Sequence, residues 1–208
     1  MIRFFVSLSC AVAMFVAIAA HGKAEAGEAT EQIKATVDQV IEITKDKNLK
    51  KPSRAAERRA AIRRVVLERF DFTEMAKRSL AVYWQQRTAQ ERKEFIPLFT
   101  DLLERSYIKK VEGYNDEKIL YSDERRDDNY AVVKTKIITK RNVEIPIDYK
   151  LMLQGGGRWE VYDISIEGVS LVNNYRTQFA KIIRTSSYQE LVKRMKSKQQ
   201  EETFEEKS

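Results

Sequence analysis

The sequence predicts an α+β fold: a four-stranded antiparallel meander sheet, packed on one face by about five or six helices. Three observations support this. Apolar residues recur at helical spacing up to about residue 111, they alternate with polar residues from about 117 to 167, and helical spacing returns after Gly168. Helices on one face of a curved sheet would make a cone-like domain, whose interior is either filled by side chains or open as an internal apolar cavity.

Two helices are expected over residues 28–49 and 53–70. Pro52 cannot continue the first of them, and Ser53 is placed to cap the second. The apolar stripe of the first helix consists of Ile33, Val37, Val40, Ile41 and Thr44, and that of the second consists of Ile62, Val65 and Val66.

Two further helices begin with the capping-box pattern. Asp71 is followed three residues later by Glu74, which predicts a short helix toward Leu80, and Thr88 followed by Glu91 predicts a helix to about residue 111. Pro97 lies inside this last helix and should kink it or delay its start. About half of its circumference is apolar, more than a surface helix needs: Phe95, Ile96, Leu98, Phe99, Leu102, Leu103 and Tyr107.

Four strands are expected over residues 117–123, 129–140, 143–153 and 158–167. They are separated by turn-forming residues at 127–129, 141–142 and 155–157, and such short connections predict antiparallel neighbours. The third strand has one uninterrupted apolar face, made of Val143, Ile145, Ile147, Tyr149, Leu151 and Leu153. One face of the sheet is therefore expected to be dry and the other wet.

Two helices are expected after the strands. Ser170 is placed to cap a helix through Ile183, and Ser187 with Glu190 is placed to start a last helix toward Lys198. A single α+β domain is expected to span residues 27–198, and residues 199–208 are expected to form a charged flexible tail.

Residues 1–26 read as a cleavable signal peptide. Arg3 precedes an apolar run over residues 4–20, and Ala24-Glu25-Ala26 matches the small-x-small pattern before a cleavage site. A retained membrane anchor is the alternative, but the run is short for a span and a cleavage motif follows it. A lipoprotein cleaved at Cys10 would leave too short an apolar region.

The single cysteine, Cys10, and the single histidine, His21, both lie in this leader. From Gly27 onward the chain therefore has no thiol and no imidazole, which excludes disulfides, Cys-His and Ser-His-Asp chemistry, and the ligands that zinc and copper favour. The formal charge of the chain is +7, and the leader contributes a net +1, which leaves +6.

Several segments resemble the MlaC family of periplasmic phospholipid-binding proteins, also described as toluene-tolerance auxiliary proteins. They are residues 70–76 (FDFTEMA), Tyr83-Trp84, residues 95–107 (FIPLFTDLLERSY), residues 145–149 (IPIDY) and, most strongly, residues 159–179 (WEVYDISIEGVSLVNNYRTQF). Their ordered series covers nearly all of the chain after the leader.

The resemblance implies a soluble carrier in the periplasm of a Gram-negative bacterium. Family members exchange phospholipid between an outer-membrane lipoprotein-porin complex and an inner-membrane ABC transporter with an MCE-domain subunit. It implies no enzyme activity, no catalytic residues, no metal and no cofactor, with phospholipid as cargo and a monomeric chain. The acyl chains would lie in a dry cavity lined by Phe95, Phe99, Leu102, Leu103, Val133, Ile137, Ile145, Ile147, Tyr149, Leu151, Trp159, Val161, Val169, Leu171, Tyr175 and Phe179.

Each feature also has an alternative interpretation. The apolar stripes could be plain core, and Lys134, Lys136 and Lys140 could form either a solvated sheet face or a docking surface. An enzyme acting on small apolar substrates could use Asp148 and Tyr149, although alternation puts them on opposite faces of a strand. Nucleic-acid binding would suit the positive charge but not export, and a docking protein would have a filled core.

Overall fold

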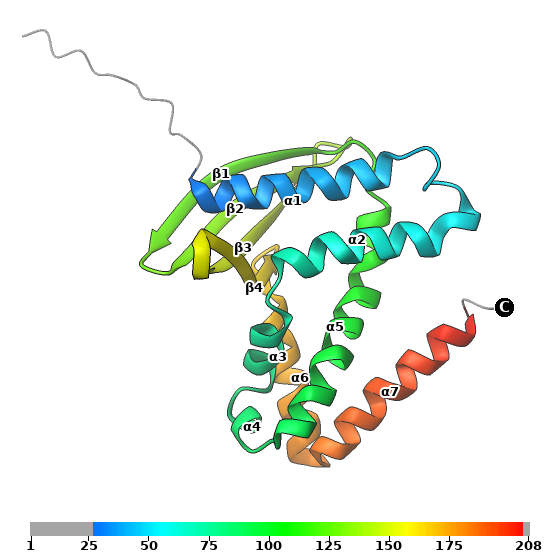
Figure 1. Cartoon of the computed structure of the whole chain (residues 1–208), viewed down its shortest axis with the longest axis vertical. Helices are drawn as coiled ribbons and strands as arrows, with labels where there is room; N and C mark the ends of the chain where they lie inside the picture. Colours follow the sequence, from blue (N-terminus) through cyan, green and yellow to red (C-terminus); the bar gives the residue numbers. More distant parts are fainter. Residues whose placement is uncertain (1–26, 206–208) are drawn as a thin grey trace, which may run out of the picture.

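The computed structural model describes residues 27–205, so the expected signal peptide lies outside the described residues. The described chain is α+β and contains seven α-helices, two short 3₁₀ turns and five strands (Figure 1). In chain order the elements are α1 (Glu28–Lys45), η1 (Pro52–Arg54), α2 (Ala55–Arg69), α3 (Phe72–Leu80), α4 (Val82–Gln85), α5 (Ala89–Glu112), β1 (Lys118–Asp127), β2 (Tyr130–Ile138), β3 (Glu144–Gln154), η2 (Gly155–Gly157), β4 (Arg158–Ile166), β5 (Val169–Ser170), α6 (Leu171–Thr185) and α7 (Tyr188–Glu205).

The sheet is an antiparallel meander with the strand order β1-β2-β3-β4-β5. The predicted count of four strands was wrong, because Val169 and Ser170 turn back after Gly168 and pair with Ile166 and Ser165 as a fifth, edge strand. A strand of two residues is too short to show alternation, and the same residues lead directly into α6, so the pattern predicted only a helix cap there.

The alternation of burial along the strands confirms one dry and one wet sheet face. In β2 the buried residues are Ala131, Val133 and Thr135, and in β4 Trp159 and Val161 are buried on the same face. Beyond a shift in the β3–β4 register, Ile164 and Ile166 continue this face. Lys134 and Lys136 fall on the other face, where they pair with Asp123 and Glu144. The dry face is covered by helices, which is the layering that the sequence predicted (Figure 1).

Four of the five predicted helix caps form and one does not. The Asp71 side chain accepts a hydrogen bond from the Glu74 N–H, the Ser170 side chain accepts one from Asn173, and Thr88 with Glu91 makes a complete capping box. At the start of α7, the Ser187 hydroxyl accepts a hydrogen bond from the Glu190 N–H (3.0 Å). Ser53 caps nothing, because Pro52 starts a 3₁₀ turn that places Ser53 inside it and delays α2 to residue 55.

The helix α5 is unbroken over its 24 residues and starts directly after Thr88, so Pro97 does not delay its start. The C-terminal helix α7 continues to Glu205, beyond the predicted end near Lys198. None of the described helices is long and apolar enough to span a membrane.

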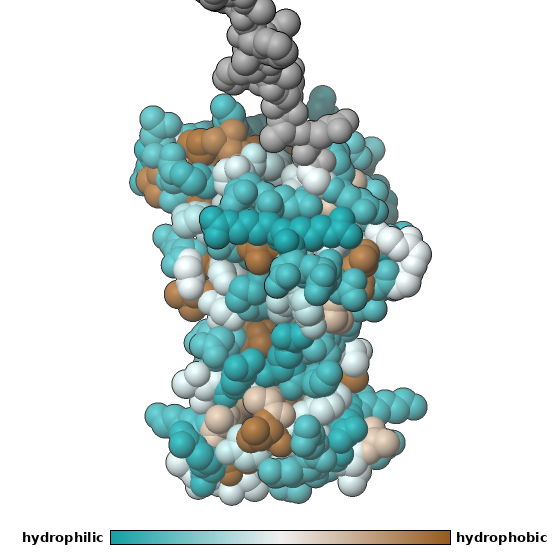
Figure 2. Space-filling model, turned by 90° about the vertical axis from the view of Figure 1, so that its left-hand side faces the viewer, coloured by the Kyte–Doolittle hydropathy of each residue, from teal (hydrophilic) through white to brown (hydrophobic). Residues whose placement is uncertain are grey.

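The buried residues form two separate cores. The sheet core joins β2, β3 and β4 to the start of α1 and contains Ala29, Ile33, Val133, Leu151, Trp159 and Val161. The helical core lies between α3, α5, α6 and α7 and includes Phe95, Phe99 and Phe179. Figure 1 shows the corresponding division into an upper part with the sheet, α1 and α2 and a lower part with α3, α4, α6 and α7, with α5 extending between them. The surface seen in Figure 2 is mainly hydrophilic, with separated hydrophobic spots.

Candidate ligand pocket

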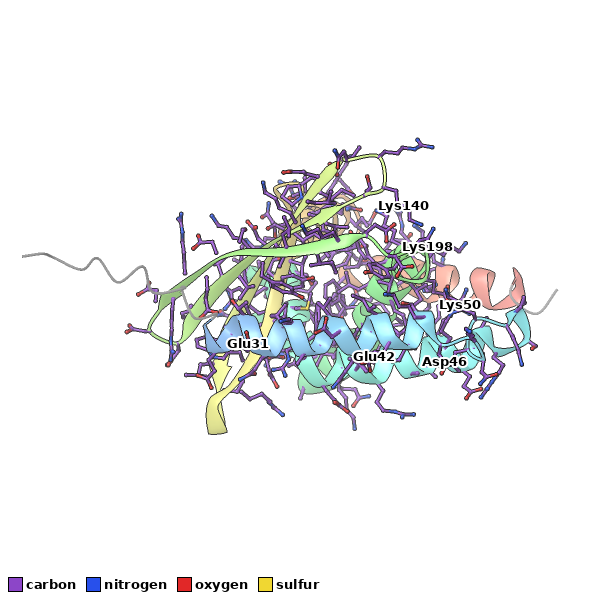
Figure 3. The ribbon with its side chains drawn as sticks, turned by 90° about the horizontal axis from the view of Figure 1, so that it is seen from above. Glu31, Glu42, Asp46, Lys50, Lys140 and Lys198 are labelled. Carbon is purple, nitrogen blue, oxygen red and sulfur yellow. The ribbon has the colours of Figure 1, made fainter. Side chains whose placement is uncertain are left out.

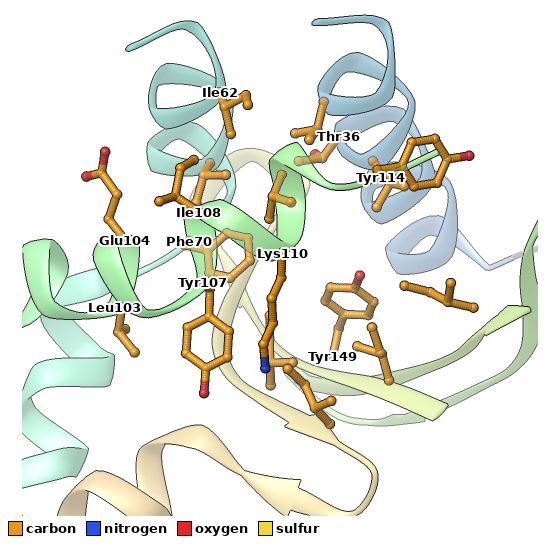
Figure 4. Close-up of a pocket in the computed structure, with 18 of the residues that line it drawn as sticks. Thr36, Ile62, Phe70, Leu103, Glu104, Tyr107, Ile108, Lys110, Tyr114 and Tyr149 are labelled. Carbon is orange, nitrogen blue, oxygen red and sulfur yellow. The ribbon is translucent and has the colours of Figure 1, made fainter. Parts of the chain in front are cut away.

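A large apolar pocket lies between the two cores, enclosed by α1, α2, α5 and the dry face of the sheet (Figure 4). Its volume is about 750 Å³, within the range of roughly 300–1,000 Å³ that ligand sites occupy. Its apolar lining residues include Ile33, Val37, Val40, Ile41, Ile62, Val66, Leu67, Phe70, Phe72, Met75, Leu103, Ile108, Val111, Ile119, Ile137, Ile145, Ile147, Ile164, Ile166 and Leu171.

The three helical threonines in this lining use their hydroxyl groups to bond to their own backbone. The Oγ1 atom of Thr36 donates to the carbonyl of Gln32 (3.0 Å), and Thr44 and Thr100 donate likewise to carbonyls of their own helices. These hydrogen bonds satisfy the hydroxyl protons locally, so that polar positions contribute little polarity to the pocket. The pocket is therefore suited to an apolar ligand and offers few groups that could orient a polar one.

Charged side chains occur at the edges of the pocket. Arg63 of α2 and Glu104 of α5 both line it and form an ion pair with each other. Lys110 also lines it, and its Nζ lies 5.4 Å from the centre of the Tyr107 ring. An apolar interior with charges at its rim fits an amphiphile whose polar end stays near water.

Tyr149 of β3 is the titratable group of the lining whose pKa is most strongly raised by desolvation. Burial raises the pKa of its hydroxyl to about 12, and a hydrogen bond with Thr135 partly opposes the shift. The phenol is therefore neutral at physiological pH. Asp148, the residue that could have acted with it as a base, is not among the residues that line the pocket. The two groups do not converge on one ligand atom.

The pocket brings together six of the sixteen residues that the sequence suggested as cavity lining: Leu103, Ile137, Ile145, Ile147, Tyr149 and Leu171. Four of these come from the neighbouring strands β2 and β3, where the alternating pattern identified the dry face correctly. They form the floor against which α1, α2 and α5 enclose the pocket.

The other ten lie elsewhere. Phe95, Phe99 and Phe179 are buried in the helical core, with Leu102 and Tyr175 packed against it. Val133, Leu151, Trp159 and Val161 are in the sheet core beneath α1, where Val133 is fully buried. Val169 is 58% exposed, because β5 is an edge strand. Alternation identified the dry face, but not which part of that face is covered by a helix and which part faces open space.

The sequence did not indicate the pocket residues of α1 and α2. Val37, Val40, Ile41 and Val66 were recognised only as apolar stripes. One signal in the sequence could have shown that α5 contacts more than one apolar surface, namely the breadth of its apolar stripe. The first half of α5 faces the helical core through Phe95 and Phe99, and its second half faces the pocket through Tyr107 and Ile108.

Fold and pocket define an α+β protein that encloses an apolar site between an antiparallel sheet and helices. The chain belongs to the MlaC family: the family's sequence model, described as MlaC protein, matches residues 34–197. No group of three or more Asp, Glu, His or Cys residues that could hold a metal ion occurs in the described part of the chain.

Two relatives illustrate the similarity. The intermembrane phospholipid transport system binding protein MlaC of Haemophilus influenzae is 26% identical over 120 residues, a match spanning 56% of this chain and 56% of that protein. The structure of a phospholipid-binding protein from Ralstonia solanacearum in complex with a phospholipid superposes with a TM-score of 0.72 at 24% identity, covering 82% of this chain and 96% of that one. The second likeness establishes the shared fold.

Proposed function

We propose that this chain is a phospholipid carrier that holds its cargo by the acyl chains, inside the pocket between α1, α2, α5 and the sheet. The observation that carries the proposal is the size of the pocket together with its almost entirely apolar lining. Membership of the MlaC family and the phospholipid bound to the Ralstonia solanacearum protein of the same fold support it. The fold and the family favour a binding protein over an enzyme.

The energetics of acyl chains explain why a pocket is needed. Each buried methylene contributes about 0.8 kcal/mol, so one chain of ordinary length represents on the order of 12 kcal/mol. A lipid that leaves a bilayer loses this favourable free energy unless its acyl chains stay shielded from water. An enclosed apolar pocket shields them, whereas an exposed surface does not. A useful carrier binds lipid about as well as the bilayer does, because much tighter binding would prevent unloading. The net direction of lipid transport then depends on the protein complexes with which the carrier exchanges lipid.

We further propose where this carrier works and which complexes it meets. The carrier works in the periplasm after removal of residues 1–26, and it exchanges lipid with an inner-membrane MCE-domain ABC transporter complex and an outer-membrane lipoprotein-porin complex. The name of the Haemophilus influenzae relative, an intermembrane phospholipid transport system binding protein, supports this assignment. The net charge of +6 that remains after the leader suits an environment of anionic headgroups.

A vesicle assay tests the carrier function. Donor vesicles contain a fluorescent phosphatidylethanolamine with a quencher, acceptor vesicles contain neither, and release from quenching reports transfer. The purified protein is expected to raise the transfer rate in proportion to its concentration, because each molecule shields acyl chains on the way through water. Bovine serum albumin at equal mass concentration controls for nonspecific adsorption. A rate that does not depend on folded protein would contradict the carrier function.

A further inference from the structure

The helical hairpin over the pocket is attached to the rest of the molecule in two different ways. This hairpin, residues 28–69, comprises α1, the connecting segment with η1, and α2, and it is called the lid below. Its residues supply one whole side of the pocket lining, including Val37, Ile41 and Ile62 (Figure 4). How the lid is fixed therefore determines how a ligand reaches the pocket.

One end of the lid, the start of α1 with the end of α2, is anchored to the sheet. The N–H and the hydroxyl of Thr30 donate to Glu124 of β1 (2.7 and 2.6 Å). The guanidinium of Arg69 donates to the carbonyl of Trp159 in β4 and to the side chain of Gln32 (2.6 Å each). Buried apolar residues of the sheet core lie at the same end, so this end is fixed by packing and hydrogen bonds together.

The opposite end of the lid is held by ion pairs to the end of α5. The guanidinium of Arg58 contacts the Glu112 carboxylate at 2.7 and 3.0 Å, and Arg59 contacts the same carboxylate at 3.3 Å. This carboxylate is 12% exposed. One turn further along α2, Arg63 pairs with Glu104. These pairs, Arg58 and Arg59 with Glu112 and Arg63 with Glu104, are called the latch.

Little apolar packing supports the latch. Within α2, all of which the structure describes, only Ile62 is buried. Leu67 lies one turn beyond Arg63 on the side of α2 that faces α5; it lines the pocket and is nevertheless 46% exposed. Leu67 is thus the most exposed of the large apolar residues that line the pocket, and it lies next to the latch. Figure 3 shows that the far end of α1, marked by Glu42 and Asp46, leads into the loop with Lys50.

We infer that the lid opens like a hinged cover: it pivots at its anchored end, the latch releases, and the acyl chains pass between α2 and α5. This inference rests on the proposed function. Ion pairs suit such a role because water hydrates the two charges again when the lid opens. Apolar surfaces that separate gain no such compensation from water. The exposed side chain of Leu67 gives the acyl chains an apolar contact at the opening.

A reversible crosslink across the latch tests this inference. In the full chain carrying Cys10→Ser, no other cysteine remains, so Arg59→Cys with Glu112→Cys introduces a single pair for a bis-methanethiosulfonate linker that a reductant removes. Transfer between vesicles is expected to be at least about tenfold slower when the pair is linked. After reduction it should exceed the Cys10→Ser parent, because the latch carboxylate is gone. Circular dichroism verifies the fold of each form.

A matched control links two helices away from the pocket. Glu94 of α5 and Lys196 of α7 form an ion pair (2.5 Å), and neither lines the apolar pocket. Linking Glu94→Cys to Lys196→Cys is expected to leave transfer unchanged. A second, uncrosslinked variant, Glu104→Gln with Glu112→Gln, should speed transfer without a linker and covers the case in which the cysteine pair misfolds.

The outcomes separate the lid from the carrier function. Equal transfer by the linked and reduced forms, with lipid bound and transferred by both, would overturn the lid inference and leave the carrier function standing. Absence of bound lipid and of transfer in the Cys10→Ser parent itself would overturn the carrier function.

Discussion

Replacing Ile147 with tryptophan is expected to abolish lipid loading while the protein remains folded. Ile147 lines the pocket from β3 and is partly exposed, so an indole ring there extends into open space rather than into packed core. If it displaces about three methylene groups at about 0.8 kcal/mol each, affinity falls roughly fiftyfold. A carrier that only matches the bilayer in affinity would then lose the lipid. Phospholipid extracted per mole of purified protein measures the effect.

Glu144→Trp provides the matched control for this change. Glu144 lies on the same strand but on the wet face, where its ion pair with Lys136 is exposed and contributes little to stability. This variant should keep the lipid content of the parent. Parental lipid content in a folded Ile147→Trp variant would show that the acyl chains do not occupy this part of the molecule.

Replacing Phe99 with alanine is expected to have the largest effect on stability, with little effect on lipid binding by the molecules that stay folded. Phe99 is fully buried in the helical core, and its ring contacts those of Phe95, Tyr175 and Phe179 at centroid distances of 5.8–6.1 Å. Loss of such a side chain leaves a cavity and costs about 3–5 kcal/mol. Because domains are stable by only about 5–15 kcal/mol, urea unfolding should show a much lower midpoint.

The contrast between the two substitutions separates core from pocket. Phe99 was a candidate lining residue on the sequence alone, yet it does not line the pocket. At low temperature without urea, folded Phe99→Ala protein should retain lipid in the parental ratio. Loss of lipid with an unchanged unfolding midpoint would place the acyl chains against Phe99 instead.

The elements of the fold were largely predictable because they depend on local signals. Thr88 with Glu91 fixed the start of α5, and the alternation in β3 fixed which residues face the helices. The exceptions depend on interactions that are not local. Val169 and Ser170 become a strand only because β4 is beside them. Ser53 lost its capping role to the 3₁₀ turn that Pro52 starts.

The site was predictable in kind but only partly in position. A dry sheet face and a wide apolar helix face indicated that an apolar cavity was possible, and Ile145, Ile147 and Tyr149 do line the pocket. The same pattern also selected Val133, which lies under Ala29 and Ile33 of α1 in the sheet core. A bulky substitution at Val133 would therefore disrupt packing instead of filling the pocket. Periodicity defines a face, whereas only tertiary packing decides which part of that face is covered.

Native mass spectrometry can show whether this pocket holds a phospholipid. The protein is purified without detergent from a periplasmic extract, and its mass is measured before and after solvent extraction. We expect a stoichiometric adduct with the mass of a phospholipid, which extraction removes and which the folded Ile147→Trp variant lacks. A well-folded protein that has the bare polypeptide mass, and takes up no lipid when incubated with vesicles, would contradict it.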